Sequence, residues 1–237
     1  VMIARLLPSK NQSVNYDEFL RQLSKAGFRG EVAYSYGQRT VLATDNSIYQ
    51  RLPQAAVFPV DAQDVQILAT LAADPAHRSI VLTPRGGGTG TNGQSLTDGV
   101  VVDLSRHMNT IIEINAEERW VRVQSGVVKD QLNASLKPHG LFFAPELSTS
   151  NRATIGGMIN TDASGQGSCT YGKTRDHVLD LSTVLLGGEL LHSAVLGQSA
   201  LEQETARRDR IGDVYRCAVD IADNQAYLIE RTFPKLN

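Results

Sequence analysis

The sequence predicts an α+β fold with two α/β lobes. Residues 55–104 alternate strand, helix, strand, glycine-rich loop and strand, the order expected of a small, mostly parallel sheet. Two later stretches instead predict hairpins: residues 110–126 give two strands joined by a short turn, and residues 178–191 give an apolar strand that returns through a Gly-Gly turn. The second lobe is therefore expected to hold antiparallel or mixed strands flanked by helices.

Each element of the first half has a local reason. Residues 15–28 predict an amphipathic helix, whose apolar positions fall at helical spacing: Phe19, Leu20, Leu23 and Ala26. Residues 29–53 carry short β-prone pieces and turn residues. Residues 55–60 form an apolar run that predicts a buried strand. A helix is expected over residues 61–74, with Asp61 as its N-cap.

In the second half, residues 127–140 predict a helix closed by Pro138 and Gly140. Residues 154–167 are rich in small side chains and are expected to open with a short helix. The tail from residue 198 to 237 is charged and mostly helical in pattern. No linker separates the halves, so both lobes are expected to belong to one domain.

Composition excludes several classes of function. The net charge of −2 does not favour nucleic acid or an anionic membrane surface, and no apolar run approaches the roughly 20 residues of a membrane span. The N-terminus lacks the apolar core of a signal peptide, which predicts a cytoplasmic protein. Cys169 and Cys217 are too few for a disulfide framework or for a zinc or iron–sulfur site, which takes about four ligands. The histidines show no metal spacing, and a Gly-x-Ser-x-Gly hydrolase motif is absent.

The stretch TPRGGGTGTNGQ, residues 83–94, needs a backbone that approaches a ligand or adopts positive φ. Consecutive N–H groups in such a loop form a nest for phosphate. It is not a Walker loop, because Gln94 follows Gly93 where that motif needs lysine, and it is too turn-rich to open a Rossmann helix. A plain surface loop remains an alternative. A second small-residue segment, 144–172, favours a ligand, since two such segments can cradle the two ends of one extended molecule.

Four motifs occur in an order and spacing that resemble one family: PRGGGTGTNGQ, VVVDLSRHMNTIIEIN, VRVQSGVVKDQLNASLKPHGLFFAPELS and ATIGGMINTDASGQGSCTYG. The chain resembles, over about residues 42–190, the PCMH-type FAD-binding domain of the vanillyl-alcohol-oxidase flavoproteins. It is most similar to the branch of D-lactate, glycolate and D-2-hydroxyglutarate dehydrogenases, and within it to large bacterial members that fuse a flavin domain to an iron–sulfur domain.

The resemblance implies roles for individual residues. It assigns the pyrophosphate-binding loop to Gly86, Gly87, Gly88, Thr89, Gly90, Thr91, Asn92, Gly93 and Gln94. It assigns the wall around the flavin to Pro145, Glu146, Leu147, Thr154, Ile155, Gly156, Gly157, Ala163, Ser164, Gly165, Tyr171 and Gly172. Arg85 balances phosphate charge, anchors the loop or forms a surface ion pair. Asn160 is a further cofactor-binding candidate, although Asn160 and Asp162 serve equally well as helix caps. His177 is expected to have a structural role.

The resemblance also implies the chemistry and its boundaries. A flavoenzyme of this branch oxidises a D-2-hydroxy acid by hydride transfer to flavin N5. Thr89 stands where some members carry the histidine that bonds FAD covalently, so noncovalent FAD is expected. A closing segment of the type GSEGTLAVVTEA, a substrate-binding cap domain and the cluster cysteines are not found, so no catalytic residue is assigned and the domain is expected to be incomplete.

The expected organisation is a lead-in over residues 1–50 and the FAD-binding domain over 51–237, with lobes at about 51–105 and 106–237. The partners expected from the resemblance are a small 2-hydroxy acid and an unnamed electron acceptor, with neither nucleic acid nor a membrane span. Peripheral association with the inner membrane face stays open. The alternatives are a noncatalytic nucleotide- or phosphate-binding module and an NADPH-using reductase of the same fold.

Overall fold

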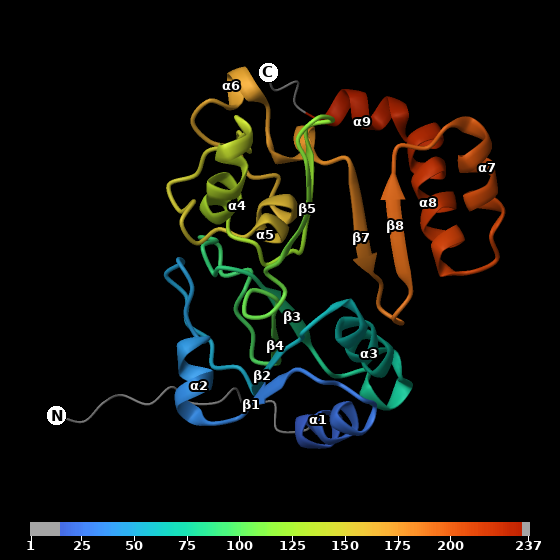
Figure 1. The fold of residues 1–237 in the computed structure, drawn as a ribbon. Coiled ribbons are helices and arrows are strands. Elements are labelled where there is room, and N and C mark those ends of the chain that lie inside the picture. The colour runs from blue at the N-terminus through green and yellow to red at the C-terminus, as the bar shows by residue number, and fades with distance from the viewer. Residues whose placement is uncertain (1–14, 234–237) are drawn as a thin grey trace. The chain divides into compact units, whose positions relative to one another are not determined.

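The computed structural model describes residues 15–233, which form two compact units (Figure 1). Within that range, the large unit comprises the chain up to Val178 together with Leu186–Gly188. The small unit comprises Leu179–Leu185 and the residues from Glu189 onward. The opening residues 1–14, where no signal peptide is expected, and the last four residues of the predicted helical tail lie outside the described range.

A four-stranded sheet organises the first part of the large unit, in the order β1 (Glu31–Ala33), β2 (Ala55–Phe58), β4 (Val100–Asp103) and β3 (Leu82–Arg85). Strands β2 and β3 each run parallel to β4, whereas β1 pairs antiparallel with β2 at the edge. The prediction of a small, mostly parallel sheet is therefore confirmed. The glycine loop follows β3 at the carboxyl end of the parallel strands, where ligands of α/β sheets usually bind.

Both faces of this sheet are covered, which explains why β2 and the Val100–Val102 part of β4 are apolar without alternation. On one face, helices α1 (Tyr16–Lys25) and α3 (Ala62–Ala73) contribute to a core made of Phe19, Leu20, Leu23, Phe28, Ala55, Val57, Leu68, Val100 and Val102. The opposite strand positions form a smaller cluster of Ala33, Ala56, Phe58 and Val101. Helix α3 begins at the predicted cap, since Asp61 accepts from Asp64 N, and α1 begins at Asn15, which accepts from Glu18 N.

One local expectation is wrong, because residues 29–53 are not only strand and turn. They include helix α2 (Tyr36–Val41), which begins with a capping box between Ser35 and Gln38. The Ser-x-x-Gln spacing was a readable signal for this helix start. The 3₁₀ turn η1 (Pro75–His77) follows α3.

A second core supports the rest of the large unit (Figure 1). Its elements are β5 (Ile111–Asn115), β6 (Trp120–Val123), α4 (Lys129–Leu136), η2 (Lys137–His139), α5 (Ile155–Asn160), α6 (Ser168–Tyr171) and η3 (Thr174–His177). Strands β5 and β6 form the predicted antiparallel pair. The buried residues of this core are Val127, Leu132, Leu136, Ala153, Ile155 and Met158. Gly140 ends the α4–η2 segment in the left-handed conformation, as the sequence predicts.

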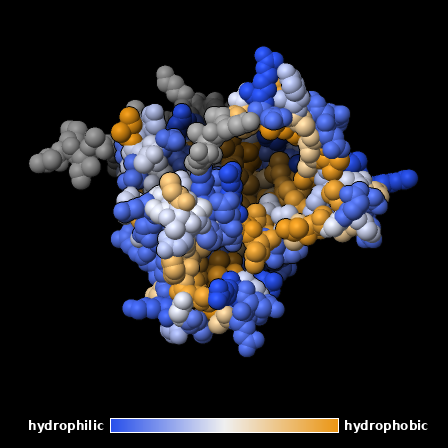
Figure 2. Space-filling model, turned by 90° about the horizontal axis from the view of Figure 1, so that it is seen from above, coloured by the Kyte–Doolittle hydropathy of each residue, from blue (hydrophilic) through white to orange (hydrophobic). Residues whose placement is uncertain are grey.

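The small unit consists of the predicted hairpin β7 (Asp180–Val184) and β8 (Leu190–Ala194), followed by α7 (Gln198–Ala206), α8 (Arg210–Asn224) and α9 (Ala226–Thr232). Asp209 caps α8 by accepting a hydrogen bond from Gly212 N at 3.0 Å. Several large apolar side chains of this unit are exposed, among them Leu190, Ile221 and Leu228. Figure 2 shows hydrophobic residues at the molecular surface among hydrophilic ones.

Candidate functional site

The two glycine segments meet, as the sequence suggests. A Cβ at Gly86 would overlap Thr154 Oγ1, and a Cβ at Gly87 would overlap the carbonyl oxygen of Arg152. A side chain at either position would overlap these atoms. Glycine is therefore needed where the loop passes the start of α5. The loop and the second segment are therefore brought into direct contact within the large unit.

The backbone amides of the loop are largely unused by the protein itself. Among the described residues, the N–H groups from Gly86 to Thr91 donate to no protein acceptor. Gly88 has φ +61° and Gly93 φ +73°, conformations that favour glycine. A row of unpaired, closely spaced N–H groups at the carboxyl end of a parallel strand is the arrangement that binds phosphate oxygens.

Arg85 anchors this loop rather than forming a surface ion pair. Its Nη2 donates to the carbonyl oxygen of Thr44 at 2.8 Å, and Nη1 lies 3.4 Å from Ser95 Oγ. Burial lowers the pKa of Arg85, and the nearby charges of Asp103 and Asp45 oppose that shift. The arginine stays charged, since its ordinary pKa lies far above neutrality. It ties the loop to the segment that follows α2.

Asp45 continues the network beneath the loop. Its Oδ2 accepts from Ser95 Oγ at 3.0 Å and its Oδ1 accepts from Ser47 N at 2.8 Å. Burial raises the pKa of Asp45, but the hydrogen bonds from Ser47 and Ser95 and the charge of Arg85 outweigh it and leave the pKa below its ordinary value. The carboxylate is therefore ionised at neutral pH and helps to balance Arg85.

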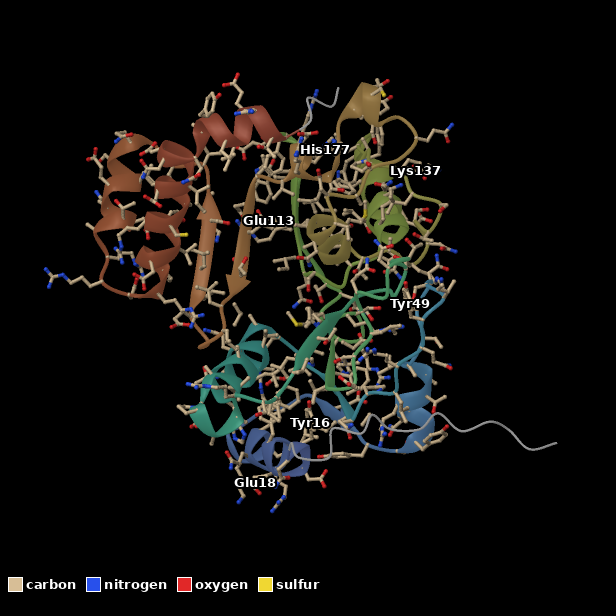
Figure 3. The ribbon with its side chains drawn as sticks, turned by 180° about the vertical axis from the view of Figure 1, so that it is seen from behind. Tyr16, Glu18, Tyr49, Glu113, Lys137 and His177 are labelled. Carbon is tan, nitrogen blue, oxygen red and sulfur yellow. The ribbon has the colours of Figure 1, made fainter. Side chains whose placement is uncertain are left out.

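Two further side chains shape the loop. Gln94 folds back over it, so that Gln94 Oε1 accepts from Asn92 N at 3.1 Å and a Cβ at Gly90 would overlap the amide group. Tyr49, labelled in Figure 3, comes from the segment between α2 and β2, and its ring would lie 3.0 Å from a Cβ at Gly93. Tyr49 is 57% exposed, so the ring covers the loop without being part of the core.

The second segment is held by α4 and α5. Thr154 caps α5 through Gly157 N at 3.4 Å, and Gly156 N donates to Ser125 O at 2.8 Å. Gly165 passes over the backbone of Glu146, where a Cβ at Gly165 would overlap the carbonyl oxygen. The predicted wall residues differ in exposure. Pro145, Thr154 and Ile155 are buried; Leu147, Gly156, Ala163 and Gly172 are half-buried; Glu146, Gly157, Ser164, Gly165 and Tyr171 are exposed.

Three predicted candidates have structural partners. Asn160 Nδ2 donates to Gly156 O at 3.0 Å within α5, and Asp162 Oδ1 accepts from Arg175 N at 3.1 Å. His177, labelled in Figure 3, pairs with the carbonyl oxygen of Tyr171 at 2.8 Å and meets the ring of Phe143 edge-on. These contacts give Asn160 and His177 roles in shaping the second segment.

Sequence reasoning missed Lys129, Asp45 and Ser95. Lys129 lies at the start of α4, and its side chain is 2% exposed while it donates to Glu146 Oε2 at 2.9 Å. A lysine within an amphipathic helix pattern gives no signal that its ammonium group is buried. In residues 15–233 no cluster of His, Cys, Asp or Glu is suited to a metal ion, and none of the described helices could cross a membrane.

The mostly parallel sheet, the unpaired loop amides and the apposed second segment define a dinucleotide-binding domain. Residues 53–194 match the family described as FAD binding domain, and the chain belongs to this family. The cofactor of the family is FAD. The residues present fit it, because the loop leaves its amides unpaired and its glycines leave no room for side chains.

Known proteins resemble the chain closely. It is 71% identical to D-2-hydroxyglutarate dehydrogenase of Pseudomonas putida over 236 residues, covering 100% of this chain and 23% of that protein. It is 58% identical to D-2-hydroxyglutarate dehydrogenase of Escherichia coli over 219 residues, covering 92% of this chain and 22% of that protein. The chain thus spans about a fifth of the length of these curated relatives.

A solved structure confirms the fold. An alkyldihydroxyacetonephosphate synthase structure aligns with a TM-score of 0.66 at 24% identity, covering 81% of this chain and 41% of that one. At this identity the likeness concerns the fold alone, which is the predicted α+β FAD-binding architecture.

Proposed function

We propose that this chain is the FAD-binding part of a flavin-dependent dehydrogenase that oxidises a D-2-hydroxy acid, with D-2-hydroxyglutarate as the favoured substrate. The observation that carries the proposal is the row of unpaired amides from Gly86 to Thr91 beside Thr154. The choice among D-2-hydroxyglutarate, D-lactate and glycolate rests on relatives that are 71% and 58% identical to this chain, both named D-2-hydroxyglutarate dehydrogenase.

In this proposal the loop residues 86–92 hold the pyrophosphate through backbone N–H groups, with Gly93 and Gln94 beside it. The segments around Glu146, Thr154 and Gly165 form the wall for the isoalloxazine. Arg85 acts through the loop, because its Nη1 and Nη2 groups donate to the carbonyl oxygen of Thr44 and to Ser95 Oγ. The FAD-binding domain is proposed to extend over residues 51–237, with lobes at about 51–105 and 106–237.

Held by the backbone N–H groups of residues 86–92, FAD would supply the redox chemistry, as the acceptor at flavin N5 for hydride from Cα of the hydroxy acid. The residues of this chain bind and orient the cofactor, and fixing its pyrophosphate fixes the position of the ring for the substrate. The base for the hydroxyl proton and the cations for the carboxylate are not assigned to residues of this chain. We further propose that a cap domain for the substrate and an iron–sulfur cluster belong to parts of the protein outside residues 1–237, and that the enzyme is cytoplasmic.

The test is anaerobic reduction of the intact protein followed by visible absorption. Addition of D-2-hydroxyglutarate is expected to bleach the flavin bands, while the L-enantiomer leaves them unchanged. A colourless protein that does not take up added FAD would contradict the cofactor assignment. Bleaching by D-lactate or glycolate alone would move the substrate to that acid, and bleaching by NADPH alone would replace the proposal with the reductase.

A further inference from the structure

Lys129 and Glu146 form an ion pair with very unequal burial. The side chain of Lys129 is 2% exposed and that of Glu146 is 51% exposed, and Lys129 Nζ lies 2.9 Å from Glu146 Oε2. Among the described residues, Glu146 is the only carboxylate within ion-pair distance of this ammonium group. Burial of an ammonium group costs free energy unless the group is paired. The positions of Lys129 and Glu146 therefore depend on each other.

The backbone around Lys129 holds the far end of the same segment. Lys129 N donates to Ala153 O at 3.0 Å, and Asp130 N donates to Ser150 O at 3.2 Å. The side chain meanwhile reaches Glu146 at the near end. Residues 146–153 are therefore fastened at both ends to the first turn of α4, once through main-chain bonds and once through the ion pair.

Glu146 is also confined at its backbone. Its carbonyl oxygen lies directly beneath Gly165, where no side chain would fit. Glu146 thus contacts the ammonium group of Lys129 through its side chain and Gly165, in the segment that closes the proposed flavin wall, through its carbonyl oxygen. A shift of Glu146 would displace both that segment and its neighbours Pro145 and Leu147.

Stability alone gives a weak reason for this arrangement. A buried ion pair is often replaced by apolar side chains of similar volume without loss of stability, because desolvation offsets the attraction between the charges. A methionine at position 129 would fill similar space. What methionine could not supply is the directed hydrogen bond that fixes the Glu146 carboxylate and its backbone.

We propose that Lys129 is a positioning residue of the flavin site, which acts through Glu146 to hold residues 145–147 where the isoalloxazine packs. This inference rests on the proposed function. It assigns no contact between Lys129 and the cofactor, because the ammonium group is already bonded to Glu146 and is shielded from solvent.

The test compares Lys129→Met and the double variant Lys129→Met/Glu146→Gln in the intact protein after FAD has been removed. Two quantities are measured for each: the Kd for FAD, from quenching of flavin fluorescence, and the thermal midpoint of the apoprotein. Lys137→Met is the matched control (Figure 3), because Lys137 is an exposed lysine at the end of the same helical segment.

Lys129→Met is expected to weaken FAD binding by about tenfold, by analogy with the loss of a group that orients the ligands of a metal site. The double variant leaves no unpaired charge and is expected to keep the thermal midpoint of the wild-type apoprotein, yet its FAD affinity stays weakened. The visible circular dichroism of its bound flavin should also differ from wild type. Lys137→Met should match wild type in every measurement.

Wild-type FAD affinity in either variant would overturn the positioning role while leaving the proposed function intact. Parallel loss of affinity and thermal midpoint in both variants would show a merely structural role and would overturn it too. If the wild-type protein itself does not bind FAD, the proposed function falls and this inference falls with it.

Discussion

Thr154 Oγ1 occupies the space that a side chain at Gly86 would need. The two residues come from segments far apart in the sequence, and their contact is the point where the glycine loop meets the cap of α5. The fit is so close that the loop can pass Thr154 only as bare backbone. The contact therefore links the geometry of one glycine segment to that of the other.

Gly86→Ala should test this contact. The added methyl group must push Thr154 or the loop aside, which is expected to cost about 1–3 kcal/mol in the free energy of unfolding and to weaken FAD binding. Adding Thr154→Ala should recover part of the loss, because it removes the overlapping oxygen. Denaturant titration and FAD titration measure the two effects. Gly37→Ala is the control, since nothing lies within 4 Å of its Cβ, and equal losses for both glycines would contradict the explanation.

Arg85→Lys should weaken the anchor of the loop. Lysine lacks the planar fork that spans Thr44 O and Ser95 Oγ, so a loss on the order of 2 kcal/mol in unfolding free energy is expected from the charged hydrogen bonds. Arg51→Lys, at an exposed arginine with one long ion pair to Asp98, should change stability by no more than about 0.5 kcal/mol. Indistinguishable denaturation curves for the two variants would rule out the anchoring role.

Asp64→Ala should destabilise the large unit. The Asp64 side chain is fully buried and accepts from Arg29 N and Val60 N, each at 3.0 Å. Its removal leaves two backbone donors unpaired, at about 1–3 kcal/mol each. Asp64→Asn keeps one oxygen acceptor and should lose less. Thermal unfolding of the three proteins checks the order, and equal losses for the two uncharged variants would show that the charge matters more than the acceptors.

The bound flavin should be released when the protein is denatured. Thr89 carries a hydroxyl group where covalent members of the family have a bonding histidine, so no bond to the flavin is expected. Acid precipitation of the holoprotein, followed by absorption of the supernatant, checks this. Colour that stays in the pellet would mean that another residue forms the covalent link.

Asp209 should make α8 sensitive to acid. The hydrogen bond from Arg207 and that from Gly212 N lower the pKa of Asp209 to about 2. Because this value lies below the unfolded pKa of roughly 4, the contribution to stability is fully present above pH 4. It is lost as the pH falls toward 2. NMR titration of the carboxyl carbon measures the pKa directly.

Asp209→Asn is the control for this titration. Asparagine caps a helix as well as aspartate does but carries no titrating charge. Helix content of the variant should therefore lose the part of its pH dependence that Asp209 contributes between pH 4 and 2. An unchanged acid profile in the variant would assign the effect to other carboxylates.

Local elements were predictable because their signals are local. The cap Asp61, the buried strand β2 and the left-handed Gly140 all follow from residues that are neighbours in the sequence. Helix α2 was missed although its Ser35–Gln38 capping box was readable. The β-prone residues around this short helix gave a stronger signal in the sequence than its six residues did.

The site was predictable as a set of segments, whereas its internal contacts were not. The order of the glycine segments indicates a nucleotide. The contact between Gly87 and the carbonyl oxygen of Arg152, however, depends on how the chain packs. The same holds for Lys129, whose partner Glu146 is fixed by the path of the chain between α4 and α5. A single sequence contains no signal for such pairs.

Two hydrogen bonds tie the glycine loop to the segment after α2: Arg85 donates to Thr44 O, and Asn46 N donates to Gly88 O. They determine where the N-terminal boundary of an isolated domain should lie. The family match begins at residue 53, after both partners. A polypeptide that begins at residue 53 would keep every glycine of the loop but would lose Thr44 and Asn46, which hold the loop in place. Exchange of flavin domains between related enzymes should therefore carry the segment from α2 onward as an inseparable part of the module.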